Sequence, residues 1–228
     1  MARKPRLDLP GVTQHIIQRG NNKACCFRDD SDFSTYINWL DEAARKNNTE
    51  IHAWVLMTNH VHLLVTPQQK NASSKMMQSL GRRYVAYFND KYDRTGTLWE
   101  GRFKSCLVES VNYVLACYRY IELNPVRANM VNSPAEYHWS SYQANAVGKD
   151  ISLCSPHEEY LALGENKAHR LNRYKHLFTT MNDNIKYAEI RQSTSRGLAI
   201  GSDAFLNEIE RQCQKPVRPV RPGRPRKK

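Results

Sequence analysis

The sequence predicts an α+β fold in which an antiparallel sheet carries helices, and three observations support this prediction. Apolar runs of strand length alternate with segments of helical periodicity. Gly, Asn and Asp residues, which are typical of turns, separate these segments. The 228 residues are 40% hydrophobic and 25% charged, which is an ordinary globular composition. A chain of this length holds one core domain of the usual size and an appended region.

The pattern of the N-terminal residues predicts one strand followed by one helix. Residues 12–19 form a strand-like run, and the Gly-Asn-Asn-Lys sequence of residues 20–23 indicates a turn after it. A helix is expected from an N-cap at Ser31 to Asn47, because apolar residues recur there at helical spacing. These apolar residues are Phe33, Tyr36, Ile37, Leu40, Ala43 and Ala44.

The next segments predict a hairpin, a helix, a strand and a further helix. Residues 51–57 and 60–65 are apolar runs separated by two residues, which predicts a β-hairpin. A helix is expected over 73–91 and a fourth strand over 102–109; Ser110 then caps a third helix that Pro125 stops. Without its last helix, the order β-α-β-β-α-β-α is that of the ferredoxin-like, split βαββαβ fold, with two helices on one sheet face. The other face is then available for a site.

The chain is expected to divide into three parts. Residues 1–145 form the core domain with the additional helix, and residues 146–214 form an α-helical accessory region. Helices are expected there near 157–163, 168–181, 184–194 and 203–213. Residues 191–210 favour a plain helical hairpin, with a helix-turn-helix as the alternative. Residues 215–228 form a basic Pro/Arg tail that is expected to be disordered when free.

The charge of the chain indicates a polyanionic partner. The formal net charge is +12 and the pI is about 9.5, which favours nucleic acid because each cation placed on a phosphate releases counterions. The tail contributes seven of these charges and no acidic residue. Its three-residue repeat would place Arg218, Arg221 and Arg224 along one edge of an extended rod. Residues 222–226, which end in Arg226, resemble an AT-hook, and a generic basic tail is the alternative.

Membrane insertion and secretion are not predicted. The apolar runs fall far short of the roughly 20 residues that span a bilayer. The basic N-terminus is followed by Asp8, Pro10 and Gly11 instead of an apolar stretch, so no signal peptide is expected. The protein is expected to be cytoplasmic, with its six cysteines reduced because they form no CxxC pair.

Two histidines form the first candidate for a chemical site. His60 and His62 are two residues apart on a predicted strand, so both imidazoles leave the same face of the sheet. They are candidates for metal ligands, and a pair of structural histidines is the alternative for an isolated motif of this kind. The histidine-triad hydrolases also carry His-x-His, but they need a third histidine where this chain has Leu64.

The third predicted helix supplies a candidate nucleophile. Tyr120 and Asn124 are four residues apart and therefore share one helix face. A phenol, with a reference pKa of about 10, attacks a phosphodiester only if a cation polarises the phosphate oxygens. Two histidines and the amide oxygen of Asn124 would give a three-ligand, open metal site next to Tyr120. A rim tyrosine without chemistry is the alternative.

These residues resemble a known enzyme family. His60-Val61-His62 resembles the HUH motif, and residues 120–127, Tyr-Ile-Glu-Leu-Asn-Pro-Val-Arg, resemble the tyrosine helix of single-tyrosine HUH transposases. The chain is most similar to the REP-associated tyrosine transposases. The resemblance covers about residues 8–145 and includes the segments 18–22, 53–57, 98–103 and 139–142.

The resemblance implies a fold, a reaction and a substrate. It implies a ferredoxin-like catalytic domain, dependence on Mg²⁺ or Mn²⁺, and Tyr120 as the nucleophile that forms a 5′-phosphotyrosine on single-stranded DNA. Hairpin-forming palindromic repeats are the implied substrate, and the protein would be a monomer or a homodimer. Asn124 stands where insertion-sequence relatives carry a glutamine, which is longer by one methylene.

The sequence leaves alternative functions open and offers several candidate residues for DNA contacts. The alternatives are an HUH replication initiator or relaxase-type nuclease, and a catalytically silent DNA-binding regulator. The candidate DNA-binding residues are Arg19, Lys23, Arg82, Arg83 and Arg102 in the core, with Arg218, Arg221, Arg224 and Arg226 in the tail.

Overall fold

The computed structural model describes residues 6–180 and 183–219 of the chain. Within these residues, the centre of the molecule is a five-stranded sheet with the order β2-β3-β1-β4-β5. The first four strands pair in antiparallel fashion, and β5 is parallel to β4. The strands are β1 (Gln14–Arg19), β2 (Thr49–Met57), β3 (His60–Pro67), β4 (Lys104–Val108) and β5 (Ala199–Ile200).

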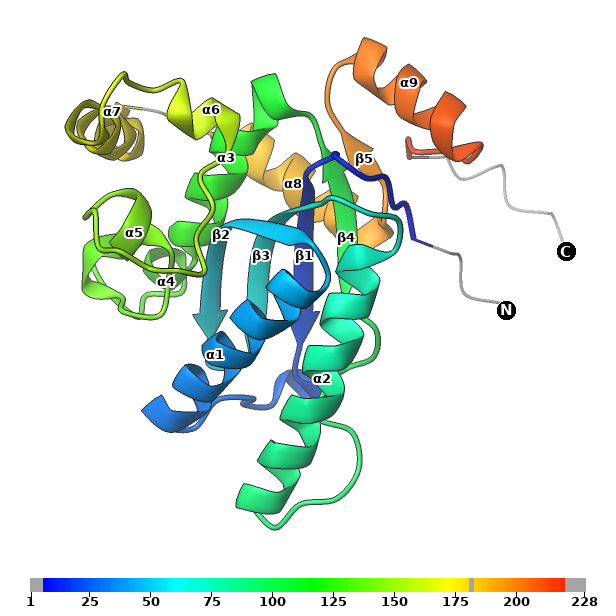
Figure 1. Cartoon of the computed structure of the whole chain (residues 1–228), viewed down its shortest axis with the longest axis vertical. Helices are drawn as coiled ribbons and strands as arrows, with labels where there is room; N and C mark the ends of the chain where they lie inside the picture. Colours follow the sequence, from blue (N-terminus) through cyan, green and yellow to red (C-terminus); the bar gives the residue numbers. More distant parts are fainter. Residues whose placement is uncertain (1–5, 181–182, 220–228) are drawn as a thin grey trace, which may run out of the picture.

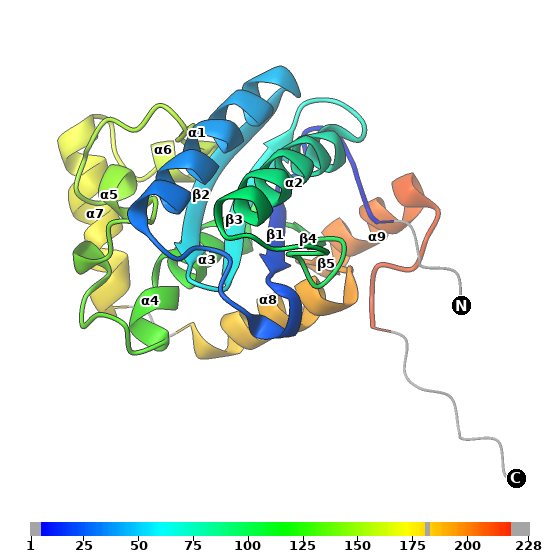
Figure 2. The same cartoon turned by 90° about the horizontal axis from the view of Figure 1, so that it is seen from below.

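Helices cover both faces of this sheet (Figures 1 and 2). Helices α1 (Asp30–Lys46) and α2 (Ala72–Lys91) pack on one face, and α3 (Ser110–Glu122) and α8 (Asn184–Arg196) pack on the other. The remaining elements are η1 (Asn21–Lys23), α4 (Asn124–Arg127), η2 (Pro134–Glu136), α5 (Tyr142–Asn145), α6 (Glu158–Leu161), α7 (Lys167–Thr180) and α9 (Asp203–Cys213).

The two larger hydrophobic cores of the described residues follow from the alternation of side chains along the strands. On β3, Val61, Leu63 and Val65 belong to the core under α1 and α2. Leu64, which leaves the opposite face, belongs to the core under α3 and α8. His62 shares that face with Leu64, so the folding pattern that builds the two cores also selects the side on which the histidines lie.

The predicted ferredoxin-like core is confirmed, with corrections at helix ends. The N-cap of α1 is Asp29, whose carboxylate accepts from the backbone N–H groups of Ser31 and Asp32, so the prediction of Ser31 as the cap was wrong. Glu109, not Ser110, occupies the N-cap position of α3. Pro125 ends α3 as expected, but the chain then makes one more helical turn, α4, with Pro125 in its first turn.

The C-terminal region takes part in the sheet, which the sequence analysis did not predict. Residues 199–200 form β5, and α8 packs against β4, β1 and α3. The start of the predicted disordered tail is also ordered: Val217 is fully buried, and its carbonyl accepts from the N–H of Ala199. Residues 146–180 and 183–219 therefore extend the core, and the rest of the tail lies outside the described residues.

Among the residues placed in the structure, none of the helices combines the length and the apolar character that crossing a bilayer requires.

A buried carboxylate fixes α3 to the C-terminal helices. Glu122 is fully buried and accepts three hydrogen bonds, from Ser141 at 2.5 Å, Asn145 at 2.8 Å and Tyr174 at 2.6 Å. Burial raises the pKa of Glu122 from 4.5 to about 7, while the three hydrogen bonds act in the opposite direction. The network joins α3 to α5, to the turn before it and to α7.

Glu122 is expected to make the stability of the fold depend on pH. Its folded-state pKa lies above the unfolded value, so stability is lost as the pH rises from 4.5 to about 7. The total loss is roughly 3 kcal/mol at about 1.36 kcal/mol per unit of pKa. Glu122→Gln should remove this part of the pH dependence in urea unfolding at pH 5 and pH 8, whereas the exposed control Glu165→Gln should not. Equal pH dependence in wild type and Glu122→Gln would contradict this assignment.

Candidate active site

The site lies on the sheet face that α3 and α8 cover. Strand β3 presents His60 and His62 to this face, as the two-residue spacing predicted. Strand β1 pairs with β3 so that Ile17 lies opposite His62 and Arg19 lies opposite His60. His15 of β1, two residues before Ile17, leaves the same face and reaches His62.

Tyr120 of α3 lies against these histidines. The centroid of its ring is 5.6 Å from that of His62 and 5.6 Å from that of His15, in edge-on geometry. The rings of His60 and His62 are 5.0 Å apart. The sequence prediction that both imidazoles face the tyrosine within one site agrees with this geometry.

His60 is half-buried and held by polar neighbours. Its Nδ1 lies 2.6 Å from Oδ1 of Asn59, and because an amide oxygen only accepts, Nδ1 carries the proton. Burial and, after it, the charge of Arg19 lower the pKa of His60, while Asn124, which can accept a hydrogen bond from the protonated ring, acts in the opposite direction, and the resulting pKa is about 4. The ring is therefore neutral at physiological pH, and its Nε2 is unprotonated.

His62 is buried and bonded to a second buried histidine. Its Nδ1 lies 2.9 Å from Nε2 of His15, and the two rings are nearly coplanar, with an angle of 4° between them. Burial lowers the pKa of His15 to about 3 and lowers that of His62 well below 6.5, to which the charges of Arg127 and Arg191 add. Both rings are neutral, as a metal ligand must be.

Asn124 joins the tyrosine helix to the histidines. Its side-chain Nδ2 donates to the carbonyl oxygen of Tyr120 at 2.8 Å, so Oδ1 is the atom that remains for other partners. Asn124 and His60 line the same cavity. The four-residue spacing of Tyr120 and Asn124 therefore brings both to the site, although α3 ends between them at Glu122.

A cavity of about 440 Å³ opens between these side chains. Arginines surround the tyrosine: the guanidinium of Arg127 lies 5.0 Å from the centroid of the Tyr120 ring, and Arg191 of α8 lines the cavity wall. The lining also includes His15, Ile17, Arg19, His60, His62, Lys104, Asn124, Thr194 and Ser195. Neutral histidines beside several cations give a pocket suited to an anionic group.

The donor set fits one divalent cation. His60 and His62 use Nδ1 within the protein, which leaves Nε2 of each ring for a ligand, and Asn124 offers Oδ1. In the described part of the chain, no three His, Cys, Asp or Glu side chains gather into a metal-binding group. A cation at this site would therefore depend on the amide oxygen as its third protein ligand.

The structure separates the predicted DNA-binding residues into groups. Arg19 and Arg102 line the cavity, where Arg19 pairs with Glu100 at 2.6 Å. Lys23 lies in the η1 turn after β1. Arg82 and Arg83 lie on α2, which covers the other sheet face, and Arg83 pairs with Glu42. The last two residues are therefore remote from the site.

In the tail, Arg218 is held within the protein. Its guanidinium pairs with Asp203 at 3.2 Å and with Glu210 at 3.0 Å, both on α9. Arg218 was expected on an extended, solvated rod. In the structure its guanidinium instead pairs with two carboxylates of α9. Arg221, Arg224 and Arg226 lie outside the described residues.

Four residues that approach the site from other elements are not among the candidates that the sequence offered. These residues are His15, Arg127, Arg191 and Thr194. His15 carried a usable signal, because it is a histidine within the strand predicted over residues 12–19. Arg191 and Thr194 carried none, since they are more than 60 residues from Tyr120 in the chain.

Comparison with known proteins agrees with the fold and gives the family. The structure is similar to a REP-associated tyrosine transposase solved with a bound REP hairpin, with a TM-score of 0.56 and 16% identity over 69% of this chain and 99% of that chain. A solved putative transposase from Deinococcus radiodurans is 20% identical over 57% of this chain and 92% of that chain, with a TM-score of 0.37. No curated protein matches the chain.

The model of the family described as "Transposase IS200 like" matches residues 9–124, which include the whole four-stranded antiparallel part of the sheet, His60, His62 and Tyr120. This match covers just over half of the chain, and the protein belongs to the IS200-like transposase family.

Proposed function

We propose that the protein cuts and rejoins single-stranded DNA, with Tyr120 as the nucleophile. The observation that carries this proposal is the convergence of Tyr120 with His60, His62 and Asn124 in one cavity. A catalytically silent regulator would not need a tyrosine, two neutral histidines and an amide oxygen to meet at one point. The relative of similar fold, which was solved with a REP hairpin, supports this choice of substrate class.

The reaction exchanges one phosphodiester for another. The hydroxyl oxygen of Tyr120 attacks phosphorus and loses its proton, while the bond from phosphorus to the 3′ oxygen breaks and that oxygen takes up a proton. The products are a 5′-phosphotyrosine and a free 3′-OH. A 3′-OH that attacks the phosphotyrosine reverses the exchange and joins the strands, so no external energy source is needed.

Each side chain of the site has a part in this reaction. His60, His62 and Asn124 would hold Mg²⁺ or Mn²⁺, which would polarise a non-bridging phosphate oxygen when bound. Arg127 lies over the Tyr120 ring and Arg191 lies at the cavity wall, where both can stabilise negative charge on the phosphate. The salt bridge to Glu100 keeps Arg19 at the rim of the cavity.

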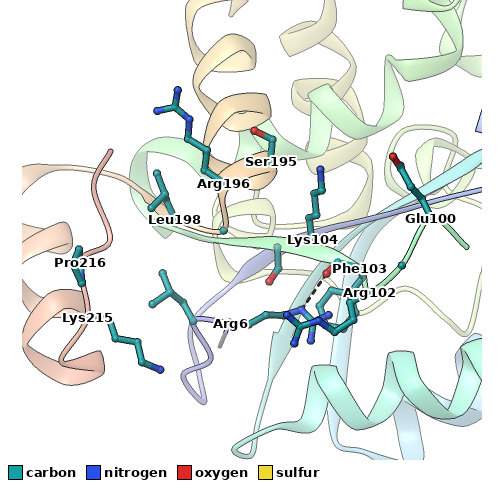
Figure 3. Close-up of a pocket in the computed structure, with 14 residues that line it drawn as sticks. Arg6, Glu100, Arg102, Phe103, Lys104, Ser195, Arg196, Leu198, Lys215 and Pro216 are labelled. Carbon is teal, nitrogen blue, oxygen red and sulfur yellow. Dashed lines mark hydrogen bonds between the residues drawn. The ribbon is translucent and has the colours of Figure 1, made fainter. Parts of the chain in front are cut away.

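A second cavity extends the site toward the edge of the sheet (Figure 3). It has a volume of about 600 Å³ and shares Glu100, Gly101, Arg102, Lys104 and Ser195 with the first cavity. Arg6, Arg196 and Lys215 add positive charge, while Leu7, Leu198 and Pro216 add apolar surface. This combination of cations and apolar side chains suits unpaired nucleotides, which expose both phosphates and base faces.

Four cations of the second cavity have no carboxylate partner in the described part of the chain. Within the described residues, no carboxylate forms a salt bridge with Arg6, Lys104, Arg196 or Lys215. Arg6 stacks on Phe103 at 3.7 Å, and burial together with the charge of Arg102 lowers its pKa to about 10. A DNA strand that leaves the first cavity through the second would relieve this repulsion.

Tyr120→Phe should lower cleavage of a hairpin-bearing single-stranded oligonucleotide by at least about 1,000-fold, because it removes the attacking oxygen and keeps the ring. DNA affinity should change by less than about threefold. Tyr187→Phe is the control, because the centroid of the Tyr187 ring lies 5.6 Å from that of Tyr120. This variant should still form the covalent adduct. An adduct on Tyr113 or Tyr118 in the Tyr120→Phe variant, detected by mass spectrometry, would assign the nucleophile elsewhere.

Removal of divalent cations with a chelator should abolish cleavage, and either Mg²⁺ or Mn²⁺ should restore it. Asn124→Ala should weaken Mn²⁺ binding about tenfold in calorimetry, because it removes the amide oxygen of the third ligand. Asn124→Asp, which keeps a side-chain oxygen, loses the donor to Tyr120 and adds a negative charge, should retain Mn²⁺ binding. Full cleavage in chelator would contradict a role for a cation.

Lys104→Gln and Arg196→Gln should each weaken single-stranded DNA binding and make the decrease of log affinity with log salt shallower by roughly 0.7 per lost phosphate contact. Arg82→Gln is a charge-matched control, since Arg82 lies on α2 on the opposite side of the sheet. Equal salt slopes for Lys104→Gln, Arg196→Gln and Arg82→Gln would exclude the second cavity as the path of the strand.

A further inference from the structure

A chain of hydrogen bonds connects His62 to the C-terminal helix α8. Nδ1 of His62 lies 2.9 Å from Nε2 of His15, and Nδ1 of His15 lies 2.7 Å from the hydroxyl of Thr194. That hydroxyl donates to the carbonyl oxygen of Ile190 at 2.7 Å. His15, His62 and Thr194 expose 1%, 2% and 3% of their surfaces, so water does not compete for these contacts.

The positions of the protons along this chain follow from the last acceptor. A carbonyl oxygen only accepts, so the single proton of the Thr194 hydroxyl points to Ile190. The hydroxyl must then accept from His15, which places the proton of His15 on Nδ1. A neutral His15 has no proton on Nε2, so Nε2 accepts from Nδ1 of His62. The proton of His62 is thereby fixed on Nδ1.

The thiol of Cys106 completes the surroundings of Thr194. Its sulfur lies 3.1 Å from the Thr194 hydroxyl oxygen. Because the Thr194 proton is used by Ile190, the thiol donates to Thr194. The hydroxyl then accepts twice and donates once, which uses its whole hydrogen-bonding capacity. No alternative orientation of the hydroxyl satisfies Ile190, His15 and Cys106 together.

We infer that Thr194 of α8, acting through His15, is a positioning residue that holds His62 as the tautomer with Nε2 open toward the site. The inference rests on the proposed function for the use of that lone pair as a cation ligand. It gives the C-terminal region a defined role at the site, because Thr194 lies beyond residues 9–124 that match the family model. In the other tautomer, the Nε2 of His62 would carry a proton and could not bind a cation.

The test compares Thr194→Val with Thr194→Ser. Valine has the shape of threonine but lacks the hydroxyl, so Nδ1 of His15 loses its acceptor and the His15 proton is free to move to Nε2. His62 would then accept at Nδ1 and carry its own proton on Nε2. Serine keeps the hydroxyl and should behave as the wild type.

The first measurement is long-range ¹H–¹⁵N NMR of the histidine side chains in the full-length protein without cation or DNA. Wild type and Thr194→Ser should show His62 with its proton on Nδ1, and Thr194→Val should show a shift toward Nε2. An unchanged His62 tautomer in folded Thr194→Val, checked by its thermal unfolding, would overturn the inference.

The second measurement is Mn²⁺ affinity by calorimetry. Thr194→Val should bind Mn²⁺ about 10-fold to 100-fold more weakly than Thr194→Ser, as is typical when the partner of a ligating histidine is lost. Unchanged affinity in Thr194→Val would overturn the role in cation binding.

A second pair of variants separates the hydrogen bond from packing. His15→Phe keeps a flat ring without an acceptor and should behave like Thr194→Val, whereas His15→Gln restores an acceptor and should recover the His62 tautomer. Equal tautomers in the two His15 variants would also overturn the inference. If the wild type neither binds Mn²⁺ nor cleaves DNA, the proposed function fails, while the NMR result still decides the proton positions.

Discussion

The antiparallel pairing of β1 with β3 is the constraint on which the rest of the site depends. Side chains alternate strictly along a strand, so the register of this pair decides which side of the sheet receives His15, His60 and His62. A slip by one residue would place the histidines in the core under α1 and α2 and would move the apolar residues that now fill it to the face under α3 and α8. The hydrophobic cores therefore decide the face on which the histidines lie, and the hydrogen bond between His15 and His62 then joins two of them on that face.

The geometry of the site also depends on the position of α3 over this face, because α3 carries Tyr120, whose ring lies against His15 and His62. Buried polar contacts hold α3 there on both sides of Tyr120 in the sequence: Arg119 pairs with Asp183 at the start of α8, and Glu122 binds the segment around α5 and α7. A buried charge is costly without its partner, so each of these contacts ties α3 to one position. The C-terminal helices thus fix the orientation of the tyrosine helix.

The distribution of arginines and lysines follows the same division between structure and site. Arg83 and Arg218 pair with carboxylates of neighbouring helices, and such charges contribute little to a long-range field. Arg6, Lys104 and Arg196 gather instead around two connected cavities at the edge of β4. The net charge of the chain therefore does not indicate where a polyanion would bind. The positions of cations that have no carboxylate partner among the described residues are a better indication.

The sequence by itself determined the four-stranded core and the main components of the site. Periodicity is a local property, so the strands, the long helices, the shared face of His60 and His62 and the spacing of Tyr120 and Asn124 could all be read along the chain. The tertiary structure alone decided what α8, β5 and the start of the tail do. Thr194 and Arg191 reach the site only because α8 packs on the sheet between β4 and α3, and no short-range pattern encodes a contact between residues so far apart in sequence. Helix ends were also decided outside the sequence pattern, since Asp29 and Ser31 are both good caps and only the path of the chain into α1 selects Asp29.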